Sequence, residues 1–208
     1  MTKKAYSPWG QADHTDPIAR GLAWVSTPGH GGVRVSRGRQ EKIPIYMQGY
    51  AIRTGDYFWY EEDIDWCIPA LIFPAEFWAH KLRQCHAQHT NAEETIARLR
   101  QLEEEAKSTL LNWRPGSYEL FFDVEIQPGE SRERDEEVFR ASTQDEFVTI
   151  CASGDWKEGV PKGMVEVVAR KASSREERVF LVPHDEYTAP RPHTFVVDET
   201  RHQERNMT

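Results

Sequence analysis

The spacing of apolar residues changes from a helical to a strand-like period along the chain, and this change restricts the fold class most. Within residues 92–112, apolar side chains recur at steps of three and four residues: Ile96, Leu99, Leu102, Ala106 and Leu110. This period predicts an amphipathic helix. Asn91 and Glu94 have the spacing of a capping box at its start, and Pro115 with Gly116 follows as an end signal.

Beyond this helix the apolar residues alternate with a period of two, which is typical of strands. Residues 118–126 predict one strand. Further strand-like runs follow, separated by turns of about ten residues: 147–153, 163–170, 178–183 and 194–198. A helical region followed by such a series predicts an α+β fold with a C-terminal antiparallel sheet.

The N-terminal part of the chain predicts a β-hairpin. Short apolar runs around Trp24 and Val35 flank a turn at residues 28–32, in which three residues are glycine. Glycine permits the backbone conformations of tight turns, so we expect an open tip rich in exposed backbone.

The remaining segments predict an N-terminal arm, central helices and a charged loop. We expect residues 1–20 to form an irregular arm and a helix to begin within residues 61–72. Residues 75–89 predict a second helix, with Phe77, Trp78 and Leu82 facing inward. Residues 127–144 predict a charged loop. We expect the C-terminal tail, from Arg201 onwards, to be frayed. Together these elements predict a single α+β domain spanning residues 1–208, a length that one domain can accommodate.

Composition excludes several classes of protein. Aromatic residues make up 11% of the chain, which argues against disorder along its whole length. The sequence has no apolar run long enough to cross a membrane, and its first residues lack the apolar region of a signal peptide. The three cysteines lack CxxC spacing, so we expect reduced thiols in the cytoplasm of a host cell rather than disulfides.

Charge is distributed unevenly along the chain, whose net charge is −8. Residues 1–60 contain eight Lys or Arg against four Asp or Glu, whereas residues 117–150 contain ten acidic residues and three Arg. An acidic chain is not expected to bind nucleic acid directly. A local basic face near the N-terminus is the alternative that this charge distribution leaves. The acidic stretch either imitates nucleic-acid phosphates or keeps the protein soluble.

The Gly-rich tip and an acidic run form the first candidate site. His30 lies in the tip, and Glu61, Glu62 and Asp63 follow an aromatic run. An imidazole with carboxylates suits metal ligation or acid–base catalysis, with Ser26 or Thr27 as a polar helper. The alternative is an ordinary turn, together with acids that stabilise a helix N-terminus. We therefore assign no metal, and no catalytic residue unless the protein is an enzyme.

A second group of potential metal ligands lies within the expected helix 75–89. Cys85 and His89 stand at i and i+4, a spacing that can chelate zinc, and His80 and His86 are nearby. The alternative is a polar helix end with surface histidines. We expect Cys67 to be a buried, inert thiol because apolar residues surround it in the sequence.

Motifs of several other enzyme classes are missing. The sequence contains no P-loop, GxGxxG, EF-hand loop or GxSxG elbow, which argues against ATP-driven, Rossmann-type and serine-hydrolase chemistry. We expect no cofactor.

Seven tryptophans in a rather polar chain suggest either core packing or a binding surface. Tryptophan and tyrosine are frequent anchors of protein interfaces. The candidate surface groups the aromatic and acidic residues of one segment: Trp59, Tyr60, Glu61, Glu62, Asp63 and Trp66. Trp78, Trp113 and Trp156 are further candidates for exposed positions.

Several motifs resemble a family of uncharacterised proteins carried by bacteriophages and plasmids. The N-terminal motifs are YSPWG (6–10), VSTPGHGG (25–32), IPIYM (43–47), WYEEDIDW (59–66) and ALIFP (70–74). The C-terminal motifs are GDW (154–156), VPKGMVEVVAR (160–170), FLVPHDEY (180–187) and FVVDETRH (195–202). The resemblance implies an origin in a mobile element and an intracellular, accessory role. Some relatives are encoded near anti-restriction genes, which implies evasion of host defence.

Three functions follow as hypotheses. We favour a non-catalytic phage or mobile-element protein that binds and inhibits a host protein, a defence or nucleic-acid-processing factor. The second hypothesis is a small metal- or acid–base-dependent hydrolase that acts on a nucleotide or nucleic acid through His30, Glu61, Glu62 and Asp63. The third is a virion or assembly component that forms a homo-oligomer.

Overall fold

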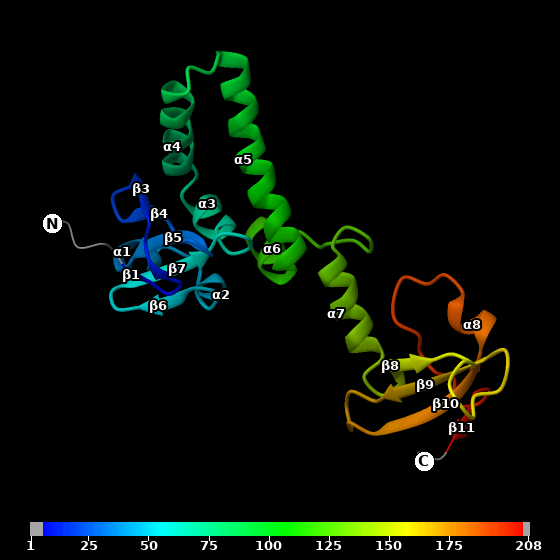
Figure 1. The fold of residues 1–208 in the computed structure, drawn as a ribbon. Coiled ribbons are helices and arrows are strands. Elements are labelled where there is room, and N and C mark those ends of the chain that lie inside the picture. Colours follow the sequence, from blue (N-terminus) through cyan, green and yellow to red (C-terminus); the bar gives the residue numbers. More distant parts are fainter. Residues whose placement is uncertain (1–5, 206–208) are drawn as a thin grey trace. The chain divides into compact units, whose positions relative to one another are not determined.

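The computed structural model describes residues 6–205, and contacts between residues divide the chain into two compact units (Figure 1). The first unit extends to Glu133 and the second begins at Arg134. Each unit contains its own antiparallel sheet and hydrophobic cluster. The expected α+β class is confirmed. That the chain folds as one domain stays a prediction, because a division by contacts does not measure cooperativity.

A five-stranded antiparallel sheet forms the centre of the first unit. Its order is β3-β4-β5-β7-β6, with bounds His14–Ala19, Leu22–Ser26, Gly31–Ser36, Tyr57–Glu61 and Ile52–Thr54. A separate pair, β1 and β2, comprises Tyr6–Ser7 and Gly10–Gln11. The hairpin of β4 and β5 is confirmed.

The expectation of an irregular arm is wrong for residues 6–7, 10–11 and 14–19, which form strands, and its residues 1–5 lie outside the described part. Residues 14–19 form β3, which pairs with β4 at the edge of the sheet. Pro17 is compatible with this position because an edge strand leaves one row of N–H groups unpaired. The register shifts between Pro17 and Ala19.

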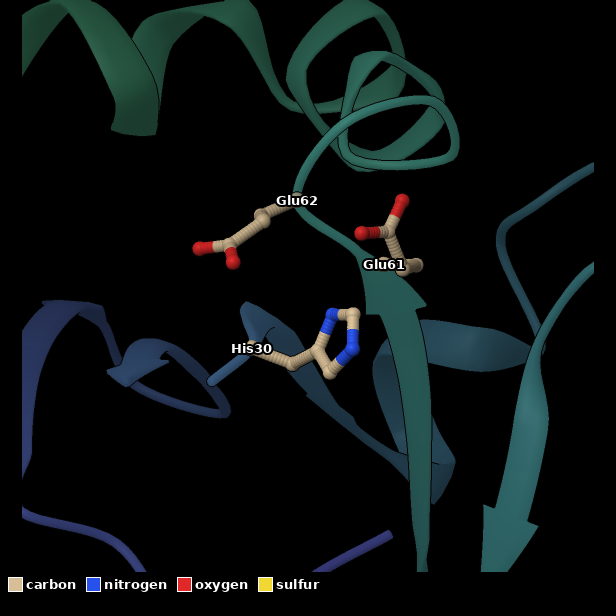
Figure 2. Close-up of side chains that lie close together, drawn as sticks. All are labelled: His30, Glu61 and Glu62. Carbon is tan, nitrogen blue, oxygen red and sulfur yellow. The ribbon is translucent and has the colours of Figure 1, made fainter. Parts of the chain in front are cut away.

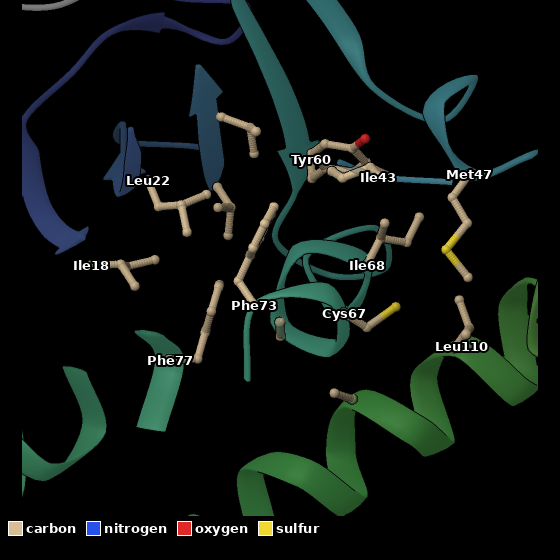
Figure 3. Close-up of a cluster of buried hydrophobic side chains, with 14 residues drawn as sticks. Ile18, Leu22, Ile43, Met47, Tyr60, Cys67, Ile68, Phe73, Phe77 and Leu110 are labelled. Carbon is tan, nitrogen blue, oxygen red and sulfur yellow. The ribbon is translucent and has the colours of Figure 1, made fainter. Parts of the chain in front are cut away.

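The two faces of this sheet contact different parts of the first unit. Leu22, Val33 and Tyr60 lie on one face and belong to the larger hydrophobic cluster, together with residues of the helices (Figure 3). Ala23, Val25 and Trp59 alternate with them, so they lie on the other face, where Trp9 and Ala12 cover them.

Between residue 6 and Phe122, the first unit contains six helices. They are α1 Arg37–Gln40, α2 Ile45–Gln48, α3 Cys67–Ile72, α4 Pro74–Ala87, α5 Ala92–Trp113 and α6 Pro115–Phe122. α4 and α5 lie side by side (Figure 1). The helix predicted over 92–112 is confirmed, and the Glu94 N–H donates to Asn91 Oδ1 at 2.8 Å.

Other helix predictions need correction. Residues 118–126 were expected as a strand, but residues up to Phe122 belong to α6, because Pro115 suits the first turn of a helix. α3 begins at Cys67, since Glu61 ends β7 and a turn follows. In α4 only Phe77 of the three expected core residues is buried; Trp78 and Leu82 are 42% and 37% exposed.

A four-stranded antiparallel sheet forms the second unit, in the order β11-β10-β9-β8. The bounds are β8 Val148–Ser153, β9 Met164–Arg170, β10 Glu177–Pro183 and β11 Gln203–Arg205, with helix α8 at His184–Thr188. Three of the four expected strands are confirmed. Residues 194–198 form a single bridge, Val148 to Val196, whereas part of the expected frayed tail pairs with β10.

The charged stretch predicted as a loop contains helix α7, Arg132–Ser142. No residue of this helix is buried, so its apolar spacing gives little signal. Glutamate and arginine are good helix formers, and the ion pair of Arg134 with Glu137 at 2.9 Å joins neighbouring turns. Among residues 6–205, no helix is both long and apolar enough to cross a membrane.

Candidate functional site

The tip of the β4–β5 hairpin holds His30 in a short, hydrogen-bonded turn. The N–H and the Oγ1 of Thr27 both donate to the carbonyl oxygen of His30, each at 2.7 Å. The N–H of His30 donates back to Thr27 Oγ1 at 3.1 Å. Thr27, named as a polar helper, therefore fixes the backbone of His30. The turn is shorter than expected, because Gly31 and Gly32 already belong to β5.

Two glycines allow this tip to approach the end of β7. A Cβ atom at Gly31 would collide with the carboxylate of Glu62 and lie 2.9 Å from the Val25 carbonyl oxygen. A Cβ atom at Gly32 would collide with the Tyr60 carbonyl oxygen. Because glycine has no Cβ atom, β5 and β7 can pair closely here. The Glu62 N–H donates to the Gly31 carbonyl oxygen at 3.1 Å.

Glu61 is the last residue of β7, and the following turn orients its carboxylate. Its Oε2 accepts hydrogen bonds from the N–H groups of Asp63 at 2.8 Å and Ile64 at 3.0 Å. The Trp66 N–H donates to the Glu61 carbonyl oxygen at 2.8 Å. The backbone of the turn thus engages one carboxylate oxygen and leaves Oε1 without a hydrogen bond from these groups.

His30, Glu61 and Glu62, three of the four residues named in the enzyme hypothesis, converge. One ligand atom from each lies within 4.8 Å of the others, and Figure 2 shows the imidazole extending from the hairpin tip toward the two carboxylates. Ligands of one metal ion are about 3 to 3.5 Å apart at metal–ligand distances near 2.1 Å. Small rotations of an exposed histidine and two half-buried glutamates can close that difference.

The structure separates the other residues named for this region. Asp63 is exposed and lies outside the cluster of three. Trp59 and Tyr60 are 2% and 0% exposed, and they pack on opposite faces of the sheet. Their contact with a partner stays a prediction. Trp66 is half-buried and packs edge-on against Trp24, with ring centroids 6.4 Å apart.

A partly buried ion pair involves Asp65, a residue of the turn that follows Glu61. Arg114 Nη2 lies 3.0 Å from Asp65 Oδ1, and its guanidinium stacks on Tyr50 at 4.4 Å. Burial raises the pKa of Asp65 above its ordinary value, and the charge of Arg114 opposes this shift. Sequence reasoning missed this pair because its members are far apart in the chain; the signal was an acidic residue between Ile64 and Trp66.

The alternative zinc ligands do not assemble, and α4 ends at Ala87, so His89 lies beyond the helix that was expected to hold it. Within residues 6–205, the only group of three potential ligands that meets is that of His30 with the two glutamates. Cys85 is completely buried, and His80 lies 3.3 Å from Asp16. Burial lowers the pKa of His80, and Asp16 opposes this shift. Among the candidate tryptophans, Trp78, Trp113 and Trp156 are exposed.

Comparison with known proteins identifies a family without an assigned activity. Residues 2–144 match the family described as Domain of unknown function (DUF7007). No curated protein and no solved structure matches the chain. The matched residues include the hairpin tip and both glutamates, and they stop before β8. Because the match covers more than half of the sequence, the chain belongs to the DUF7007 family.

Proposed function

We propose that His30, Glu61 and Glu62 bind a divalent metal ion and that the chain uses it to hydrolyse a phosphate ester of a nucleotide or nucleic acid. The observation that supports this proposal is the convergence of the three side chains within 4.8 Å. They come from two separate strand ends, and backbone hydrogen bonds position both ends.

The donor set suits an ion that accepts both nitrogen and oxygen ligands. Imidazole binds Zn²⁺ readily, and carboxylates are common ligands of Mn²⁺. Three protein ligands leave coordination positions for water and substrate, as in catalytic metal sites. A bound ion lowers the pKa of its water, so that hydroxide is available near neutral pH. Attack of this hydroxide on phosphorus would form a new P–O bond and break the bond between phosphorus and the ester oxygen. The departing ester oxygen would take a proton from solvent.

The metal site is tested by isothermal titration of the full chain with MnCl₂ and ZnCl₂. We expect one ion per chain, and an affinity at least tenfold lower in His30→Ala and Glu62→Gln, because each removes a direct ligand. Asp63→Asn is the matched control, since it removes a neighbouring carboxylate outside the cluster. Unchanged affinity in His30→Ala, or equal losses in the control, would contradict the proposed ligands.

Hydrolysis is tested with the chromogenic diester bis(4-nitrophenyl) phosphate. We expect release of nitrophenolate that requires added metal and disappears in His30→Ala while Asp63→Asn keeps it. A protein that binds the ion without turnover of this diester or of a single-stranded oligonucleotide would contradict the hydrolase proposal and leave the metal site intact.

A second candidate function is inhibition of a host protein, a defence or nucleic-acid-processing factor, by a phage or mobile-element protein. The observation that favours it is the exposed Asp63 beside two half-buried glutamates at one turn. Co-purification from a bacterial host distinguishes the proposals. If the protein is an inhibitor, the Asp63→Ala variant should lose the partner and the His30→Ala variant should keep it. Metal binding should instead be lost in His30→Ala and kept in Asp63→Ala. A partner retained by Asp63→Ala would exclude this turn as the contact.

A further inference from the structure

A basic cavity lies in the first unit, apart from the metal-ligand candidates. Its volume is about 570 Å³, and its lining includes Arg20, Arg34, Arg39 and Lys42 together with the ring of Tyr57. No carboxylate of the described residues lines it. Ligand-binding cavities are typically about 300 to 1,000 Å³, so this space can hold a nucleotide-sized molecule.

Most of these cations have no acidic partner. Arg20, Arg34 and Lys42 form no ion pair with any residue between 6 and 205. Arg39 differs, because it pairs with Glu76 and stacks on Phe73 at 4.9 Å. Three uncompensated positive charges around one cavity favour an anionic occupant.

Existing contacts hold the cavity wall in place before any ligand binds. The Arg34 guanidinium stacks on the Tyr57 ring at 4.8 Å, and Arg39 Nε donates to the Arg20 carbonyl oxygen at 3.3 Å. Gly21 has a φ of +82°, and a Cβ atom there would lie 2.5 Å from Ser36 Oγ. Glycine therefore lets the β3–β4 turn close against this wall, and the Ser36 N–H donates to the Gly21 carbonyl oxygen at 2.9 Å.

We propose that this cavity binds the phosphate groups of a nucleotide-type ligand. Guanidinium groups donate paired hydrogen bonds to phosphate oxygens, and lysine adds a mobile point charge. Tyr57, which is 41% exposed, offers an aromatic surface beside these donors. The inference is independent of the proposed metal site, since the two share no residue.

Isothermal titration of the full, metal-free chain with ATP and with tripolyphosphate tests the proposal. We expect both to bind, and binding to weaken as the salt concentration rises. Arg34→Gln and Lys42→Gln should each reduce affinity about tenfold, because each removes a charge-assisted contact. Arg53→Gln is the matched control: this exposed arginine belongs to the same sheet and lines a different cavity.

The remaining outcomes separate this cavity from other sources of binding. Circular dichroism and the unfolding temperature show whether Arg34→Gln, in a central strand, stays folded; Lys42→Gln changes an exposed residue and repeats the test without that risk. Equal losses in Arg53→Gln would overturn the assignment to this cavity. Binding of a twelve-residue oligothymidylate without ATP binding would overturn it in favour of a nucleic-acid groove. Retained ATP binding in His30→Ala supports the assignment to this cavity, because it shows that ATP binding does not depend on the proposed metal ligand His30. The two proposals can then be judged independently.

Discussion

At the scale of single residues, Gly31 determines whether the hairpin tip can approach the glutamates. We expect Gly31→Ala to destabilise the protein by about 1–3 kcal/mol, the usual cost of overpacking, because the added Cβ meets Glu62 and the Val25 carbonyl. The displaced Glu62 should also weaken metal binding. Chemical denaturation and metal titration measure the two effects.

Gly29 provides the control for this substitution. It lies in the same turn, and a Cβ atom there would meet nothing within 4 Å. Gly29→Ala should therefore leave both stability and metal affinity nearly unchanged. Similar losses in both variants would show that the turn requires glycine for its backbone conformation, and that the Glu62 contact is not the cause.

Burial controls the reactivity of the three thiols. Cys67 and Cys85 are buried and Cys151 is exposed. Burial raises the pKa of Cys67 to about 12, so its reactive thiolate is scarce at pH 8. We expect Ellman's reagent to modify one thiol per native chain at pH 8, three after denaturation, and none in native Cys151→Ser. Rapid modification of Cys151→Ser would contradict the burial of the other two.

The same pKa shift makes stability depend on alkaline pH. An acid whose pKa rises on folding binds its proton more tightly in the folded state. The protonated Cys67 thiol therefore contributes fully to the free energy of unfolding at pH values below its ordinary pKa of 9.0. This contribution is lost as the pH rises toward about 12. Between these values the free energy of unfolding should fall less steeply with pH in Cys67→Ala than in the unsubstituted protein. Parallel urea titrations measure the difference.

At the scale of elements, α5 depends on a local cap. The Asn91 side chain accepts a hydrogen bond from the Glu94 N–H at 2.8 Å. Asn91→Ala should lower the free energy of unfolding by about 1 kcal/mol, measured by urea denaturation. Asn91→Asp keeps an acceptor at this position and should retain most of the stability. A loss of equal size in both variants would argue against the cap as the cause.

The sequence predicts those elements whose signals are local. α5 has a cap and a regular apolar stripe, and the β4–β5 hairpin has its turn between two apolar runs. α6 was predicted as a strand because its aromatic residues also fit a strand pattern. α7 was predicted as a loop because it buries no residue and so shows no apolar stripe. In α6, packing of the aromatic side chains against the core outweighed the strand-like pattern, whereas in α7 the helix propensity of glutamate and arginine was decisive.

The candidate site was only partly predictable for a related reason. Its residue types were visible, but their convergence depends on β5 pairing with β7, where Gly32 lies opposite Glu61. Two helices and β6 separate these strands in the chain, and no local pattern specifies such a register. Trp59 and Tyr60 likewise became core residues because both faces of this strand are covered.

At the scale of the whole molecule, the family match and the division into units nearly coincide. The match ends at residue 144, after α7, whereas the first unit ends at Glu133. Both the glutamate cluster and the basic cavity belong to this first unit. The proposed chemistry is therefore a property of the matched region, and the sheet of β8 to β11 contributes no residue to it.

The two units have separate hydrophobic clusters, and we expect them to unfold in separate transitions. Val33 belongs to the cluster of the first unit and Val167 to that of the second, and each is 0% exposed in the centre of a strand. We expect calorimetry to show two transitions, and each Val→Ala substitution to lower only one of them by several degrees, since it leaves a cavity in one core. One transition that moves in both variants would establish the single cooperative domain predicted from chain length, because two independent cores cannot respond to the same local loss.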